Sequence, residues 1–264
     1  MSQRPHPLPR FYRWRTNLLH IPVMTVMTVV CGSLSLLVSF VDKDGRAQHR
    51  IAHLWARGLL WAAGCTLTIR GLQNLLRPPV AVYASNHTSY MDTPVIFAAL
   101  PFQFRILAKK GLWPIVFIGW YLDRSGQIPI DTGNPRSTLS SLGVGVKALR
   151  SGMPLFVFPE GKRTPNGGLQ PFLSGAAYLA IRAQVPLVPI ALSGVYDLLP
   201  IHASHLYPGE LILTAGEPID TTGMTPRQTD ELTIRLRDAI EALRNPQSAN
   251  CEHSVKESPV RVEV

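Results

Sequence analysis

An apolar run without a single charge limits most strongly what this chain can fold into. The run covers residues 21–41, about the length of 20 residues that a helix needs to cross the hydrocarbon core of a bilayer. The basic segment before it contains no acidic residue and carries Arg4, Arg10, Arg13 and Arg15. The run is long for a signal peptide and no small-residue cleavage site follows it, so we interpret it as an uncleaved membrane anchor.

A second apolar stretch, residues 51–67, follows a polar interruption at residues 42–50. It is interrupted by His53 and Arg57 and contains Trp55 and Trp61. This mixture is typical of a helix in the membrane interface, so we expect the two stretches to form a hairpin lying partly in one leaflet. Because a basic amino terminus stays cytoplasmic, such a hairpin would hold the chain at the cytoplasmic face of the membrane. A first helix that crossed alone would put the rest on the other side, and the sequence leaves that alternative open.

The charge balance indicates an acidic partner. The chain of 264 residues has 26 lysines and arginines against 17 acidic residues, a net charge of +9. Nucleic acid, anionic lipid and a phosphorylated substrate would all fit such a surplus, but hydrophobic residues make up 46% of the chain, which favours a membrane surface over nucleic acid. Cys31, Cys65 and Cys251 are scattered without metal-ligand spacing, so we expect neither a disulfide nor a metal centre.

From residue 68 the pattern changes to alternating short strands and helices. Strands are expected at residues 81–85, 104–108, 127–131, 154–159, 185–194 and 210–216. Helices are expected at residues 93–100, 112–122, 137–151 and 173–184, with a closing helix that Thr225 caps before Pro226. This order predicts an α/β fold with a mixed sheet layered with helices, preceded by the membrane-associated helical hairpin. We expect an anchoring segment at residues 1–70, a catalytic domain at residues 71–245 and a disordered tail at residues 246–264.

The segment NHTSYMD, residues 86–92, directly follows a predicted strand. His87 could accept a proton from a hydroxyl group, and Asp92 could fix the histidine tautomer and stabilise the imidazolium. Five positions on one helix would rotate the two side chains about 500° apart, so the pair requires a turn at His87 and a helix that starts near Asp92. The structural alternatives are a helix cap for Asp92 and a core hydrogen bond for His87.

The segment FPEGKRT, residues 158–164, lies at the end of the most apolar predicted strand, where ligands bind in α/β sheets. Gly161 permits a close approach of the backbone to a ligand, and Lys162 and Arg163 can hold a phosphate. Glu160 could orient those cations or accept a hydrogen bond from a substrate hydroxyl. The alternative is a solvated basic turn.

Two further segments carry weaker signals. QIPIDT, residues 127–132, follows Lys109, Lys110 and Arg124, and could be an ordinary strand with a polar end. VPLVPIALSG, residues 185–194, holds Pro186 and Pro189, which remove donors from a ladder. This indicates an edge strand or a bulge, and we interpret the segment as an edge strand that forms a wall of the site.

The four segments, in this order between residues 86 and 194, resemble the acyltransferase family that contains the 1-acylglycerol-3-phosphate acyltransferases. That family has an NHxxxxD block, a Gly-x-Ile-x-Ile-Asp-Arg-like block, an FPEGTRS-like block and a VPxVPVxI-like block. The resemblance covers roughly residues 70–220, and its first and third blocks match closely. The apolar amino-terminal segment is also similar to the membrane anchor of that family.

The resemblance implies acyl transfer to lysophosphatidic acid, giving phosphatidic acid. His87 would be the general base on the acceptor hydroxyl, supported by Asp92, and acyl-CoA or acyl carrier protein would donate the acyl group. No acyl-enzyme, metal or cofactor is implied. The glycerol phosphate would be bound by Glu160, Gly161, Lys162 and Arg163, and Lys109 and Lys110 would add positive potential.

Two departures from the family pattern concern the acceptor. Thr132 stands where the second block usually has arginine, so a phosphate contact is lost or moved to Arg124 or Arg136, and Lys162 replaces a common threonine. Another lysolipid acceptor therefore stays open. An esterase is disfavoured because no Gly-x-Ser-x-Gly elbow is present. A basic membrane-binding scaffold would explain the charge and the anchor but not the four ordered blocks.

Overall fold

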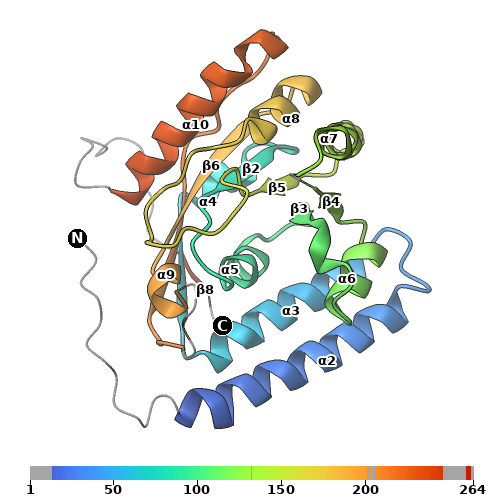
Figure 1. Cartoon of the computed structure of the whole chain (residues 1–264), viewed down its shortest axis with the longest axis vertical. Coiled ribbons are helices and arrows are strands. Elements are labelled where there is room, and N and C mark those ends of the chain that lie inside the picture. The colour runs from blue at the N-terminus through green and yellow to red at the C-terminus, as the bar shows by residue number, and fades with distance from the viewer. Residues whose placement is uncertain (1–13, 132, 201–202, 204–205, 246–259, 263–264) are drawn as a thin grey trace.

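A helical hairpin precedes the sheet in the computed structural model, which describes residues 14–131, 133–200, 203, 206–245 and 260–262. A π-helical turn, η1 (Thr16–His20), continues into α2 (Ile21–Val38), and α3 (Arg46–Ala62) returns beside it (Figure 1). The turn between the helices is tied down, because the Asp42 carboxylate accepts the Gln48 backbone N–H at 2.9 Å and the Gln103 amide donates to the Asp44 carbonyl at 2.8 Å. The predicted hairpin is therefore present; Arg4, Arg10 and Arg13 lie outside the described residues.

The two helices of the hairpin differ in what they bury. Within the described residues, Thr16–Val38 is the one helix that is long and apolar enough to cross a membrane, and only 6% of its most apolar window is buried. In contrast, α3 is amphipathic and buries Ala52, Ala56, Leu59 and Leu60 against the body of the molecule. Helix α3 thus attaches α2 to the sheet domain.

The sheet is mixed, as predicted, and has the order β4-β3-β5-β2-β6-β7-β1-β8. Its strands are β1 (Thr66–Arg70), β2 (Val82–Ser85), β3 (Arg105–Lys109), β4 (Ile128–Ile130), β5 (Leu155–Val157), β6 (Leu187–Ser193), β7 (Glu210–Ala215) and β8 (Val260–Val262). The pairs from β4 to β6 are parallel, β6 with β7 is antiparallel, β7 with β1 is parallel, and β1 with β8 is antiparallel. One half of the sheet is therefore a run of parallel strands whose carboxyl ends meet at one edge.

Helices cover both faces of the sheet. They are α4 (Leu72–Leu76), α5 (Asp92–Ala99), α6 (Ile118–Arg124), α7 (Pro135–Arg150), α8 (Gly175–Ala183), α9 (Val195–Leu198) and α10 (Thr229–Arg244), with 3-10 turns η2 (Lys110–Leu112) and η3 (Pro226–Gln228). Helices α3 and α5 lie on one face, and α7, α8 and α10 on the other (Figure 1).

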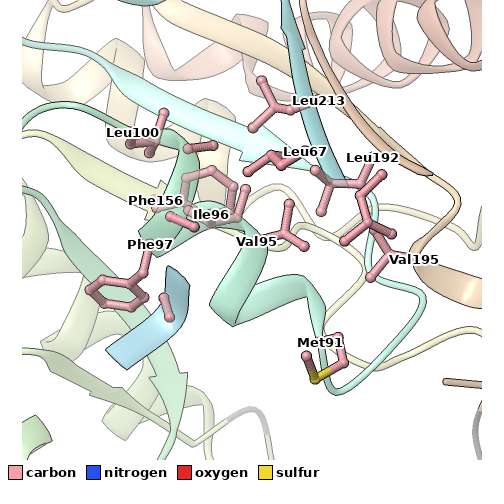
Figure 2. Close-up of a cluster of buried hydrophobic side chains, with 14 of the residues drawn as sticks. Leu67, Met91, Val95, Ile96, Phe97, Leu100, Phe156, Leu192, Val195 and Leu213 are labelled. Carbon is pink, nitrogen blue, oxygen red and sulfur yellow. The ribbon is translucent and has the colours of Figure 1, made fainter. Parts of the chain in front are cut away.

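Alternation along the strands divides the core between these two layers. Tyr83 of β2 faces the layer of α3 and α5, whereas its neighbours Val82 and Ala84 face the layer of α7, α8 and α10. In the first layer, Val95 and Ile96 of α5 lie against the side chains of the sheet (Figure 2). This packing fixes α5, and therefore its first residue, Asp92, against the strands.

The segment predicted as a helix at residues 112–122 is instead interrupted. It forms η2, then a turn, and only from Ile118 the short helix α6. Pro114 has no backbone N–H and its ring would clash with the preceding helical turn, so a helix cannot run through it. Phe117, at φ 65°, lies in the left-handed region, which also breaks the helical path.

The prediction that residues 185–194 form an edge strand is wrong, because β6 pairs with β2 on one side and β7 on the other. The missing N–H of Pro189 is accommodated by an irregularity in the neighbouring chain. Ile190 pairs with Ala215, but Leu187 forms a bridge with Ile219, so the facing segment contains one extra residue, as in a β-bulge. Proline is thus tolerated inside this sheet where the ladder is already broken.

Both ends of the sheet domain differ from the expected boundaries. Strand β1 lies before the expected boundary at residue 71, and residues 260–262 of the expected disordered tail pair with β1 as β8. The pairing occurs because β1 would otherwise leave its backbone groups without partners at the edge, and Val262 packs against the core. The rest of the expected tail, residues 246–259 and 263–264, lies outside the described residues, as does Cys251, whereas Cys31 and Cys65 are free.

Candidate active site

The predicted site segments meet at the carboxyl edge of the parallel strands. Residues 86–92 follow β2, residues 158–164 follow β5, Lys109 ends β3, and Asp131 follows β4. The parallel strands β4, β3, β5 and β2 are neighbours in the sheet, so their carboxyl ends lie side by side. This edge is where ligands bind in open α/β sheets.

His87 and Asp92 form a directly hydrogen-bonded pair. The chain turns after β2 and α5 begins at Asp92, which brings His87 Nδ1 to 2.8 Å from Asp92 Oδ2. With Nδ1–H donating to the carboxylate, the other ring nitrogen, Nε2, is left with the lone pair that a general base requires. The predicted turn and helix start are therefore both present.

The carboxylate of Asp92 is completely buried and is held by the turn itself. Its Oδ2 accepts the backbone N–H groups of Thr88 at 2.5 Å and Ser89 at 2.8 Å, and its Oδ1 accepts the Thr88 hydroxyl at 3.2 Å. A buried charge requires such donors. They also leave Asp92 no rotational freedom, so it orients the imidazole ring.

Phe158 covers one face of the His87 ring. The two rings are stacked, with centroids 4.0 Å apart and planes 16° apart, and 16% of the His87 side chain stays exposed. The sequence placed Phe158 in the third block without a role for it. Phe158 follows β5, and His87 follows the neighbouring strand β2. An aromatic residue at the end of that apolar strand is the sequence feature that could have indicated this contact.

Glu160, predicted as a substrate-binding residue, connects the two main site loops through its carboxylate. Its Oε1 accepts the backbone N–H of His87 at 2.7 Å, its Oε2 accepts that of Gln170 at 2.9 Å, and the residue is only 4% exposed. Burial raises the pKa of its carboxyl, and the two backbone donors oppose that rise. The backbone carbonyl of His87 also accepts the Thr164 N–H at 2.9 Å, so residues 160–164 hold His87 from both sides.

Arg163 lies beside the segment that contains the histidine and the aspartate. Its guanidinium stacks over the Tyr90 ring at 3.8 Å, and its buried Nε has no hydrogen-bond partner among the described residues. Gly161 has φ 66°, a left-handed conformation that is strained in a residue with a side chain, so the turn before Arg163 favours glycine. Lys162 is exposed. The loop therefore presents positive charge next to the His87–Asp92 pair.

The remaining predicted residues are placed less closely. Lys109 and Lys110 are exposed at the same edge, but no hydrogen bond or ion pair connects them to the loops of His87 or Arg163 among the described residues. Thr132 lies outside the described residues. Nor do the described residues include a group of three or more His, Cys, Asp or Glu side chains that could hold a metal ion.

Asn86 has a structural task that the sequence did not indicate. Its side-chain amide donates to the Leu192 carbonyl at 3.1 Å and accepts the Leu192 N–H at 2.8 Å. These two hydrogen bonds imitate those of a neighbouring strand, and they attach the end of β2 to β6 just before His87. The position of the histidine is therefore set by contacts to both neighbouring strands, because Asn86 bonds to the backbone of β6 and Glu160 lies in the loop after β5.

Comparisons with known proteins identify the family. The family model described as Acyltransferase matches residues 66–193. The chain is 35% identical to a chloroplastic 1-acyl-sn-glycerol-3-phosphate acyltransferase of Brassica napus over 67% of this chain and 51% of the relative, so it spans about half the length of that plant protein. A relative of that name from Chlamydomonas reinhardtii is 32% identical over 90% of this chain and 69% of its own, and one from Pseudomonas aeruginosa is 30% identical over 84% and 86%.

A solved structure supports the fold. The crystal structure of the 1-acyl-sn-glycerophosphate acyltransferase PlsC from Thermotoga maritima has a TM-score of 0.76, covers 90% of this chain and 98% of its own, and is 23% identical. With the matches in sequence, these findings show that the chain belongs to the acyltransferase family that contains the 1-acyl-sn-glycerol-3-phosphate acyltransferases.

Proposed function

We propose that this protein transfers a fatty acyl group from acyl-CoA or acyl carrier protein to the free hydroxyl of 1-acylglycerol-3-phosphate, giving phosphatidic acid. The observation that carries the proposal is the buried Asp92 carboxylate bonded to His87, with the Arg163 guanidinium beside the same turn. The relatives of matching length carry the name of this activity. The pair supplies a base, and the arginine supplies a phosphate ligand.

The proposed reaction is a direct transfer. His87 Nε2 takes the proton of the acceptor hydroxyl as its oxygen attacks the thioester carbonyl, and Asp92 stabilises the imidazolium that forms. The tetrahedral intermediate then expels the thiolate, which receives the proton from the imidazolium. One ester bond forms, one thioester bond breaks, and the histidine returns to its starting state without an acyl-enzyme.

The phosphate of the acceptor is assigned to the loop after β5. Arg163 can bind it with its terminal N–H groups while its plane stays on Tyr90, and Lys162 and the backbone at Gly161 lie next to it. Lys109 and Lys110 add positive potential from the end of β3. Glu160 supports this loop from inside and is not assigned a contact with the lipid.

The hairpin is assigned to the cytoplasmic leaflet of a membrane. Helix α2 exposes large apolar side chains along its length, including Val26, Val30, Leu34 and Leu37. Water would make this face costly, whereas lipid would cover it at no cost, and α3 returns the chain to the same side. Because the acceptor is a membrane lipid, this attachment would keep the site beside its substrate.

The test is acyl transfer by the detergent-solubilised protein from a long-chain acyl-CoA to a panel of lysolipids, with His87→Ala beside it. Product from lysophosphatidic acid that is absent with the variant supports both the reaction and the base. Product from a different lysolipid only would keep the mechanism and reassign the acceptor. No transfer from acyl-CoA or acyl carrier protein to any acceptor would refute the proposal and favour a membrane-binding scaffold.

A further inference from the structure

A turn between η2 and α6 displays apolar side chains outside the hairpin. The tip turn, defined as residues 113–120, includes this turn and the first residues of α6, and it exposes Ile115 by 45%, Val116 by 55% and Trp120 by 42%. Single exposed apolar residues need no explanation, but three in one turn form a patch that marks an interaction surface. The chemistry of the proposed reaction does not use them.

The tip turn is held in a fixed shape. Phe117 has φ 65°, a conformation that costs free energy in a residue with a side chain. Gly119 lies so close to the Trp113 carbonyl that a Cβ would come within 1.8 Å of its oxygen. Backbone hydrogen bonds from Ile118 to Val116 and from Tyr121 to Phe117, at 2.9 and 3.1 Å, close the turn. These contacts hold Phe117 in its strained conformation. The exposed shape of the tip turn therefore depends on that conformation and would be lost if the φ of Phe117 became negative.

The tip turn packs against α2. Phe117 packs so closely on Gly32 of α2 that a Cβ on the glycine would lie 2.7 Å from the Phe117 Cβ. The Phe117 ring in turn meets Trp120 edge to face, with centroids 5.1 Å apart. Figure 1 shows α6 beside the hairpin. The tip turn therefore lies directly beside the apolar helix α2.

Charged residues flank the tip turn as at a membrane interface. Lys109 and Lys110 precede the tip turn, and Arg124 follows it. Asp123, next to Arg124, is exposed as well. The Arg124 guanidinium lies over the Phe40 ring at 5.2 Å, which joins the end of α6 to the segment after α2. Cations next to aromatic and aliphatic side chains can bind lipid phosphates while the apolar groups enter the acyl region.

We propose that the tip turn inserts into the interface of the same leaflet as α2 and is a further membrane contact of this protein, one that binds anionic lipid. This inference rests on the proposed membrane attachment of the hairpin. The tip turn follows η2, which begins at Lys110, and β3 ends at Lys109 on the sheet edge that carries His87. Its insertion fixes that edge at the depth of the lipid headgroups, where the phosphate of a lysolipid acceptor lies.

The test places an environment-sensitive fluorophore at the tip. The Val116→Cys variant is made in a full-length chain whose three cysteines are replaced by alanine, and is added to phosphatidylcholine–phosphatidylglycerol vesicles with brominated acyl chains. The matched control carries the label at Val144→Cys on α7, which is 49% exposed on a different helix. We expect a blue shift and bromine quenching at position 116, and neither at position 144.

Three outcomes would overturn the inference. Vesicle-bound protein with an unquenched label at position 116 would refute tip insertion alone and leave the attachment by the hairpin intact. A blue shift without vesicles that grows with protein concentration would assign the tip to a second copy of the chain. Protein that does not bind vesicles at all would refute the membrane attachment itself.

A second variant checks the consequence for the reaction. Ile115→Asp with Val116→Asp adds two charges at the exposed tip, outside the assigned catalytic and phosphate-binding residues. We expect activity on an acceptor embedded in vesicles to fall about tenfold, since interfacial binding scales with buried apolar area, and activity on a detergent-dispersed acceptor to stay unchanged. Wild-type activity of the variant on the vesicle-embedded acceptor would contradict the inference. The same loss of activity on the vesicle-embedded and the detergent-dispersed acceptor would contradict it as well.

Discussion

The hairpin and the catalytic edge depart from ordinary burial in opposite directions. Helix α2 exposes apolar side chains such as Leu34 and Leu37, whereas the edge buries the carboxyl groups of Asp92 and Glu160. The buried carboxylates are compensated within the chain, because Asp92 and Glu160 both accept backbone N–H groups. The exposed face of α2 has no such compensation among the described residues. Under the proposed membrane attachment, lipid would cover the first departure, whereas the backbone donors of the chain itself compensate the second.

The largest expected effect is on the chemistry of the buried edge. His87→Ala removes the base, so we expect turnover to fall by about 100-fold or more. The fold should persist, because the Asp92 carboxylate keeps its bonds to the Thr88 and Ser89 backbone. Initial rates with saturating acceptor measure the loss, and circular dichroism checks the fold. Turnover near the wild-type value would remove the proposed mechanism.

Glu160 tests whether compensation inside the edge is complete. Glu160→Gln turns one acceptor oxygen into a donor that faces a backbone N–H, so we expect a loss of about 1–3 kcal/mol in the free energy of unfolding. Burial raises the pKa of the Glu160 carboxyl in the folded protein. The contribution of Glu160 to the free energy of unfolding is therefore fully present below the ordinary glutamate pKa, and it declines as pH rises through the raised pKa.

Denaturant titrations of wild type and Glu160→Gln across the acid to neutral range measure this difference. The advantage of the wild type should be largest at acidic pH and shrink as pH rises. A difference that grows with pH would show that the ionised form is the stabilised one.

The exposed face of α2 is tested by replacing one leucine on it with serine and comparing the result with the same replacement at a buried leucine. Leu37→Ser alters a side chain that is 66% exposed, so we expect unchanged thermal stability in detergent and about tenfold weaker partition to vesicles. The control is Leu236→Ser in α10, where the side chain is fully buried, and it should lower Tm instead. A lower Tm for Leu37→Ser would mean that this face packs against protein rather than lipid.

The smallest expected effect concerns the cation at the rim of the edge. Tyr90→Ala removes the ring under the Arg163 guanidinium, so we expect KM for the phosphorylated acceptor to rise about threefold, with kcat little changed. Tyr90→Phe keeps the ring and should restore the wild-type KM. Arg163→Ala should raise KM further than Tyr90→Ala, and an unchanged KM in that variant would refute the phosphate assignment.

Much of the sheet domain could be predicted from local pattern. Strands β2 and β5 are short continuous apolar runs, β7 alternates, and the helices α7 and α10 have a helical apolar period, and these elements occur where expected. The preferred prediction of an edge strand failed at Pro189, where the alternative, a bulge, is present on the facing segment. The prediction of a helix failed at residues 112–122, where Pro114 and the strained Phe117 break an apolar run that periodicity alone assigns to a helix.

The sequence by itself determined which side chains are the candidates for the reaction. The blocks around His87 and Arg163, their order and the uncharged run before them all depend on residue types and spacing, which a linear chain displays directly. The helix start at Asp92 follows from the same local information, because a pair five residues apart needs a turn.

Only the tertiary structure decided how those groups are held. Three contacts join segments that are far apart in the chain. Phe158 stacks on His87, the His87 backbone N–H donates to Glu160, and the Asn86 side chain accepts the Leu192 N–H. Glu160 shows the physical reason. A carboxylate in a loop motif has the same letter whether it contacts a substrate or a backbone N–H, and only the path of the neighbouring strand places that N–H within 2.7 Å.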